Sequence, residues 1–236
     1  MDKTTRANLD SLHSDDGDAR FAAYQALMAA TGQPVDWAYA AWAELLAMTR
    51  DANNHRRAIA TQLLCNLAQH SDPKRRMLKD FDQVLAVTHD KMFVTARHTL
   101  QSLWKVGTAG KKQQALVVER LAGRFADCAA EKNCTLIRYD IIVDLGQLYD
   151  AVGDESVKAR ALELIETEPD LKYRKKYATV FRRKKVEPSG HESLRAKKPE
   201  FEPQRPKRPG RKGKSRIGMR RISGHYLQFK FVFFRA

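Results

Sequence analysis

The chain has 236 residues, 43% of them hydrophobic, and a formal net charge of +15. That apolar fraction supports one large domain or two small ones, and no run approaches the roughly 18 continuous apolar residues of a membrane-spanning helix. The three cysteines are odd in number and show no Cys-x-x-Cys spacing, which argues against a disulfide framework or a zinc knuckle. We therefore expect a cytoplasmic protein with reduced thiols in or near its core.

Apolar residues at intervals of three and four predict an all-α fold. The expected helices, in chain order, cover about residues 4–13, 18–30, 35–49, 51–70, 73–88, 90–107, 111–128, 133–149, 154–168 and 171–185. Several have start and stop signals: Asp72 stands before Pro73, Asp90 suits an N-cap, and Gly107 can end the helix that Asp90 begins. Trp37, Trp42 and Trp104 recur at helical spacing and are predicted core residues, with Trp42 on the margin of its helix.

An arginine recurs in these helices with apolar residues three and seven positions after it. The five positions are Arg20, Arg57, Arg97, Arg138 and Arg174, separated by 37, 40, 41 and 36 residues. A period of about 40 residues that carries two helices is typical of helical solenoids. The repeat is the strongest signal in the sequence.

Charge divides the chain into two parts. Residues 1–169 hold 21 Lys and Arg against 23 Asp and Glu, whereas residues 170–236 hold 22 against 5. From residue 186, prolines with Gly, Lys and Arg between them cannot supply a core, so we expect a helical domain over 1–185 and a disordered basic tail over 186–236. Its densest charge predicts nucleic-acid binding at Lys207, Arg208, Arg211, Lys212, Lys214 and Arg216. The aromatic residues of 225–236 are typical of an aggregation-prone strand or of a reading frame whose end is not native.

The helix pairs resemble HEAT repeats, in which an inner helix begins near an acidic residue and carries an arginine before an Ala/Leu ladder. The segments that match carry Asp51 and Arg57, Asp90 and Arg97, Glu131 and Arg138, and Asp170 and Arg174. The resemblance covers roughly residues 15–185 and implies a right-handed α-solenoid of antiparallel helix pairs. It also implies that the acids and the five recurring arginines link neighbouring repeats, which is a structural role.

HEAT repeats are mostly protein-binding scaffolds, so the resemblance implies a non-enzymatic protein that binds a protein partner in a concave groove built by the inner helices. The exposed groove residues are expected to be Gln62, Asn66, His98, Gln101, Lys105, Asp140 and Gln147. Neither the partner nor the oligomeric state follows from the sequence, because groove residues of a scaffold carry specificity through shape.

Two alternatives stay open. The basic tail favours a nucleic-acid-associated protein. A HEAT-like solenoid also forms the alkylpurine DNA glycosylases, which the chain resembles in length and fold class, although the slightly acidic residues 1–169 argue against a basic DNA-binding face.

No residue pattern points to a catalytic site, a cofactor or a metal. The sequence has no Gly-rich phosphate loop and no Gly-x-Ser-x-Gly motif, and Cys65 lacks any cue for activation. His70, His89 and His98 do not make the i, i+4 pair with a third ligand that marks a zinc site. The sequence therefore favours a non-enzymatic role without settling it.

Overall fold

Helices form all the regular secondary structure of residues 1–182, the part of the chain that the structure, a computed structural model, describes. The helices are α1 (Lys3–Ser11), α2 (Gly17–Thr31), α3 (Ala38–Met48), α4 (Asn54–His70), α5 (Met77–Ala86), η1 (Val87–His89), α6 (Phe93–Leu100), α7 (Trp104–Thr108), α8 (Lys111–Asp127), η2 (Cys128–Ala130), α9 (Cys134–Val152), α10 (Glu155–Glu166), α11 (Leu171–Ala178) and η3 (Thr179–Phe181). The all-α prediction is confirmed for these residues. The predicted tail, with its nucleic-acid positions from Lys207 to Arg216, lies outside the described residues.

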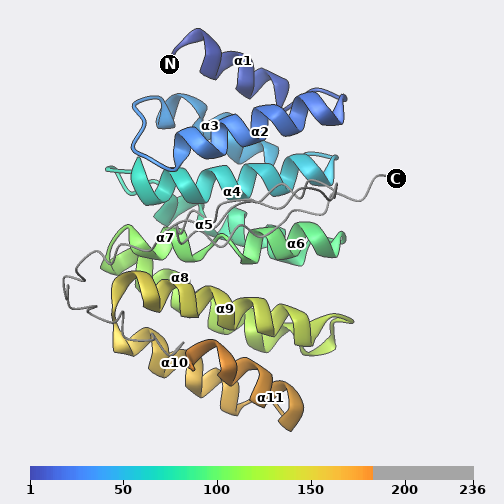
Figure 1. Cartoon of the computed structure of the whole chain (residues 1–236), viewed down its shortest axis with the longest axis vertical. Coiled ribbons are helices and arrows are strands. Elements are labelled where there is room, and N and C mark those ends of the chain that lie inside the picture. Colours follow the sequence, from blue (N-terminus) through green and yellow to red (C-terminus); the bar gives the residue numbers. More distant parts are fainter. Residues whose placement is uncertain (183–236) are drawn as a thin grey trace, which may run out of the picture. The chain divides into compact units, whose positions relative to one another are not determined.

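Residues 1–182 arrange most of these helices in two rows (Figure 1). In the front row, α2 contacts α4, α4 contacts α6 and α7, these contact α9, and α9 contacts α11. In the rear row, α3 contacts α5, α5 contacts α8, and α8 contacts α10. Consecutive helices such as α3 and α4, α7 and α8, or α9 and α10 also pack together, so these front helices have a rear neighbour that is adjacent in the sequence.

The apolar stripes of both rows meet in one core. Trp42 on α3, Leu64 on α4 and Phe125 on α8 are almost completely buried in it. Trp42 was predicted at the margin of its helix, but its side chain is fully buried and its indole Nε1 donates to Asp80 Oδ2 at 2.8 Å. The hydrogen bond explains the difference, because an indole can enter a core where its one polar atom finds an acceptor.

Short polar side chains cap several of the helices. The start predicted at Asp72 and Pro73 is wrong, because Arg75 has φ of 55°, which interrupts the helix, and α5 begins at Met77. The carboxylate of Asp16 accepts from the backbone N–H groups of Asp18 and Ala19 at the start of α2. Asn53, Asp154 and Asp170 cap α4, α10 and α11 in the same way. Gly153 ends α9 with φ of 65°, a conformation that glycine adopts without a steric penalty.

The predicted helix over 90–107 is wrong as one element, because the structure has α6 and α7 with a turn between them. At the turn, the Ser102 hydroxyl donates to the His98 carbonyl at 2.9 Å, a local bond that competes with regular helix geometry. The predicted N-cap also differs: Met92 holds that position, and Asp90 accepts from the Met92 N–H at 2.8 Å. The last helix, predicted to reach residue 185, ends at Ala178 and continues as η3.

Two glycines offer a matched test of packing. A Cβ at Gly107 would lie 2.8 Å from Leu148 Cδ1 in the core, whereas a Cβ at Gly123, exposed on α8, meets nothing within 4 Å. We expect Gly107→Ala to lower the free energy of unfolding by about 1–3 kcal/mol through overpacking. We expect Gly123→Ala to raise it by about 0.5–1 kcal/mol, because alanine restricts the unfolded chain and favours helix. Urea denaturation of both variants checks this; unchanged stability of Gly107→Ala would contradict the close packing of α7 on α9.

Residues 1–182 contain neither a membrane-spanning helix nor a cluster of metal-ligating side chains. Among the helices of residues 1–182, none combines the length and the apolar character needed to cross a bilayer. That part of the chain also contains no group of three or more His, Cys, Asp or Glu side chains that could hold a metal ion.

Candidate functional site

The front row collects the residues predicted for the groove. Gln62 and Asn66 lie on α4, His98 on α6, Lys105 on α7, and Asp140 with Gln147 on α9. Gln101 follows α6 directly, in the turn before α7. Because α4, α6, α7 and α9 contact one another in order, these positions lie along neighbouring elements of one row.

Polar contacts join the front helices to one another. Tyr24 of α2 donates its hydroxyl to Gln62 Oε1 of α4 at 2.9 Å. Asn66 of α4 donates to Thr31 Oγ1 of α2 at 3.0 Å, and its own carbonyl oxygen accepts from Lys105 Nζ of α7 at 2.6 Å. We call these contacts, together with the hydroxyl pair of Thr61 and Thr99 at 3.0 Å and the pairs of Arg97 and Asp140 below, the front-row seam.

The seam changes the expectation that the predicted groove side chains are exposed. Gln62, Asn66 and Asp140 are only 7%, 4% and 2% exposed, so the expectation is wrong for these three. Their side chains face the neighbouring helix, and their polar atoms form hydrogen bonds with it. Gln101 is exposed, and His98, Lys105 and Gln147 are partly exposed.

Bidentate or close ion pairs extend the seam toward α9 and the segment before α11. Arg97 of α6 donates to both carboxylate oxygens of Asp140 of α9, at 2.6 and 2.9 Å. Arg57 of α4 does the same to Asp90 at 2.5 and 2.9 Å, and Arg138 Nη1 of α9 reaches Glu168 Oε2 at 3.0 Å. Of the acids predicted near these arginines, Glu131 pairs instead with Arg124 of α8, at 2.6 Å.

Three of the recurring arginines share a second contact. Arg20, Arg57 and Arg174 each donate to the backbone carbonyl six residues earlier, that of Ser14, Asp51 and Glu168, at 2.7–2.8 Å. Each carbonyl lies just before a front-row helix, so the arginine fastens the start of its own helix. The same geometry at three places spaced along the chain is what a structural repeat produces.

Asp144 of α9 is a buried carboxyl that sequence analysis missed. Its side chain is 0% exposed, and neither oxygen has a hydrogen-bond partner of good geometry among the described residues. Burial raises the pKa of Asp144 well above its ordinary value, and the neighbouring Asp140 adds to the effect. Gln147, one turn further along α9, also has a buried Oε1 without such a partner. The signal available in the sequence was the i, i+4 acid pair of Asp140 and Asp144 on a predicted core helix.

The basic side chains of the front row either have lowered pKa values or lie in ion pairs. Burial lowers the pKa of Lys105, whose ammonium lies near Asp144. Burial, helped by the charge of Arg97, also lowers the pKa of His98, so its imidazole is neutral at pH 7. The face therefore presents a neutral imidazole and polar amides beside the paired Arg97 and Asp140.

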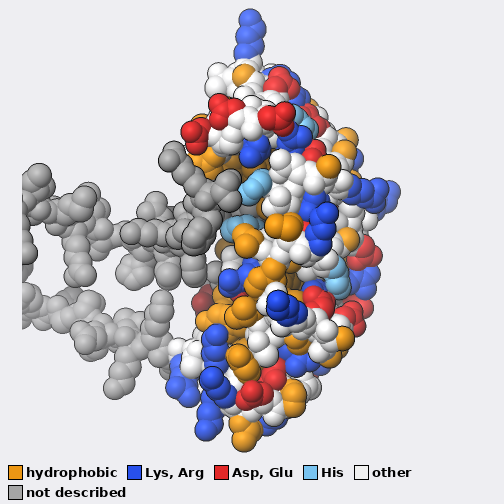
Figure 2. Space-filling model, turned by 90° about the vertical axis from the view of Figure 1, so that its right-hand side faces the viewer, with side chains coloured by type: hydrophobic (Ala, Val, Ile, Leu, Met, Phe, Trp, Pro, Cys, Tyr) orange, Lys and Arg blue, Asp and Glu red, His pale blue; other side chains and the backbone are white. Residues whose placement is uncertain are grey.

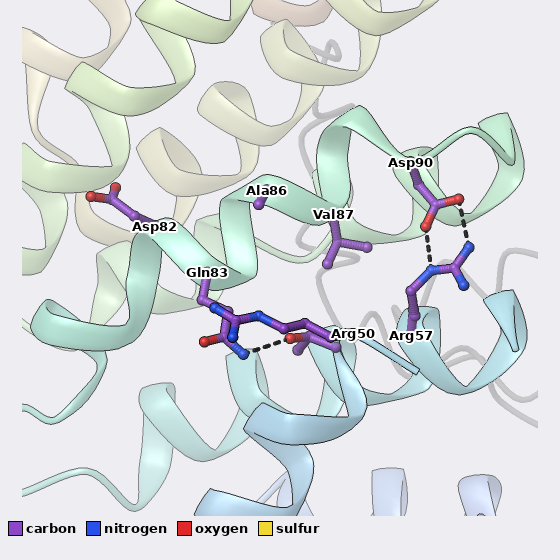
Figure 3. Close-up of a pocket in the computed structure, with 8 residues that line it drawn as sticks. Arg50, Arg57, Asp82, Gln83, Ala86, Val87 and Asp90 are labelled. Atoms are coloured by element: carbon purple, nitrogen blue, oxygen red, sulfur yellow. Dashed lines mark hydrogen bonds and ion pairs between the residues drawn. The ribbon is translucent and has the colours of Figure 1, made fainter. Parts of the chain in front are cut away.

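A cavity of about 460 Å³ lies at the connection between α3 and α4, against α5 and η1 (Figure 3). Arg57 and Asp90 face each other on one side of it, and Arg50, Asp82 and Gln83 complete the polar lining. The cavity is lined by the paired Arg57 and Asp90, by Asp82, which pairs with Arg120, and by the exposed Arg50. It marks a junction between helix pairs.

A second hollow, of about 760 Å³, lies in the rear row between α8 and α10. Small and apolar side chains such as Val118, Ala122 and Val157 form much of its wall, and Arg160 lies at it.

Basic side chains gather at the C-terminal end of the described residues. Lys172, Lys175 and Lys176 of α11 are exposed, and Figure 2 shows Lys and Arg side chains together at the lower end of its view. Lys176 also stacks over the ring of Tyr139, 4.5 Å from its centroid.

Comparison of the chain with models of known protein families gave no match, and comparison with curated proteins gave none.

Proposed function

We propose that this protein is a HEAT-like helical-repeat scaffold that binds a protein partner along its front row. In this proposal the front helices are the inner helices of a right-handed α-solenoid, and the rear helices are the outer ones. The observation that carries it is the front-row seam.

The seam supports a repeat because its contacts join residues 30–43 positions apart, and several of them lie close to 38. Tyr24 to Gln62 and Thr61 to Thr99 are both 38 residues apart, Asn66 to Lys105 is 39, and Arg97 to Asp140 is 43. Rear-row contacts repeat the spacing, with 38 residues between Trp42 and Asp80 and 38 between Asp82 and Arg120. Contacts restricted to the next helix pair are typical of solenoid proteins.

The partly exposed groups beside the seam support binding of a protein surface. Gln101, His98 and Gln147 offer hydrogen-bonding groups on successive elements held in place by the seam, and rigid polar groups of this kind suit recognition of an extended partner. The buried Gln62, Asn66 and Asp140 are accounted for by contacts between helices, so the proposal assigns binding to the more exposed residues.

Site-specific photo-crosslinking tests the proposal. A photoreactive amino acid is placed in the full-length chain at Gln101, in the front row, or at Glu163, an exposed residue of α10 beside Arg160 and the rear hollow. In extracts of the native cell, we expect a discrete protein crosslink from position 101 and none from 163. Crosslinking from 163 alone would move the partner to the rear hollow, and absence of any crosslink would count against a scaffold.

The exposed basic side chains of α11 favour a second candidate, a nucleic-acid-associated protein. Because they adjoin a basic C-terminal sequence, they would add sequence-independent affinity for phosphate backbones.

For this second candidate we expect full-length protein to bind labelled DNA or RNA with an affinity that falls steeply as salt rises. A chain ending at residue 185 should lose most of that binding. Binding insensitive to salt or to truncation would exclude the tail as its source.

The glycosylase alternative predicts that residues 1–185 alone release modified bases from DNA. If no base is released under conditions in which a known glycosylase is active, this alternative is excluded.

A further inference from the structure

Two cysteines face each other across the turn between α8 and α9. Cys128 opens η2 and Cys134 opens α9, and their sulfur atoms are 2.6 Å apart. Both are free thiols, and Cys128 is buried whereas Cys134 is partly exposed. The sequence did not predict this pair, because the two cysteines are six residues apart and lack Cys-x-x-Cys spacing.

The turn that carries the two thiols is held by contacts on both sides. The Glu131 N–H donates to the Cys128 carbonyl at 2.8 Å, and the Cys134 N–H donates to the Glu131 carbonyl at 3.0 Å. The Glu131 carboxylate is bound by the buried Arg124, at 2.6 and 2.9 Å. Because the backbone is already fixed, joining the sulfurs requires little reorganisation.

The two thiols differ in burial and therefore in reactivity. Burial, together with the contact to Cys134, raises the pKa of Cys128 to about 12, so it stays a protonated thiol at neutral pH. The partly exposed Cys134 is the sulfur that a dissolved oxidant meets first. Cys65 is fully buried on α4, and burial raises the pKa of its thiol to about 12 as well. It serves as an internal control.

We propose that Cys128 and Cys134 are a reversible oxidation site whose oxidant is a low-molecular-weight disulfide. The Cys134 thiolate attacks one sulfur of the oxidant, the oxidant's S–S bond breaks, and one thiolate leaves. The Cys128 thiol then gives its proton to solvent and attacks the Cys134 sulfur, which releases the second thiol. The protein loses two protons and two electrons, and the oxidant takes them up to become two thiols.

Exposure of the reduced full-length chain to glutathione disulfide tests the site. We expect a loss of two of the three titratable thiols, an intact mass lower by two hydrogens, and a peptide map that joins Cys128 to Cys134. Dithiothreitol should restore all three thiols. An unchanged mass, a lasting glutathione adduct on the wild-type chain, or a link through Cys65 would overturn the proposal.

Variants separate the two steps. Cys128→Ser should stop at a glutathione adduct on Cys134, Cys134→Ser should resist oxidation, and Cys65→Ser should form the same disulfide as the wild type. Circular dichroism shows that each variant keeps its helices, and the wild-type peptide map decides the question even if one does not. Oxidation of Cys134→Ser at the wild-type rate would contradict the assigned order.

Discussion

Replacing Asp90 by alanine is expected to lower the free energy of unfolding by about 2–4 kcal/mol, because it leaves a buried guanidinium without its carboxylate. The side chains of Arg57 and Asp90 are only 12% and 5% exposed. The loss stays short of the largest known values, since Arg57 keeps its bonds to the carbonyls of Asp51 and Ala52. Denaturation in urea, with helicity followed by circular dichroism, measures the change.

Two controls belong with the Asp90 variant. Asp82→Ala breaks the pair of Asp82 and Arg120, whose side chains are 69% and 38% exposed, and should change stability little. Asp90→Asn keeps a side-chain oxygen for the Met92 N–H and separates the helix start from the ion pair. Equal effects of Asp90→Ala and Asp82→Ala would mean that the buried pair contributes nothing special.

Replacing Asp144 by asparagine is expected to stabilise the protein at pH 7 and to flatten its pH dependence. The carboxyl of Asp144 is buried and its pKa is raised far above the ordinary value of 3.8. In the unfolded chain it ionises above that ordinary value, whereas in the folded protein it stays protonated up to its raised pKa. Each pH unit between the two values costs the folded state about 1.4 kcal/mol.

The sign of the Asp144 effect is opposite to that of a salt-bridged carboxylate. Stability from this group is greatest below pH 4 and falls as pH rises toward the native pKa. As pH is lowered from 7 to 5, the free energy of unfolding of the wild type should therefore rise relative to that of Asp144→Asn. Parallel pH profiles of the two proteins would show that Asp144 is ionised in the folded state and paired with a cation such as Lys105.

The helices and their spacing were predictable from local patterns. Apolar periodicity located the elements, and residues such as Asp16 and Asp154 marked their starts, since both signals act within one turn. The break between α6 and α7 was not predictable, because it depends on where Ser102 and the buried Leu103 fit against other helices.

The sequence predicted where the candidate site residues lie better than it predicted their exposure to solvent. The resemblance to HEAT repeats implied that Gln62 and Asn66 are exposed in a groove. Their burial arises from Tyr24, Thr31 and Lys105, which reach them from residues 35–39 positions away. The partners of Arg57 and Arg97 depend in the same way on contacts between helix pairs.

Polar pairs such as Arg57 with Asp90 and Arg97 with Asp140 join neighbouring elements of the front row. A double-mutant cycle with Arg57→Met, Asp90→Ala and the double variant tests this most directly, because the cycle isolates the interaction of the two side chains. We expect a coupling energy of about 1–3 kcal/mol between Arg57 and Asp90, as for residues in one ion-pair network. Additive effects, with coupling below about 0.5 kcal/mol, would contradict it.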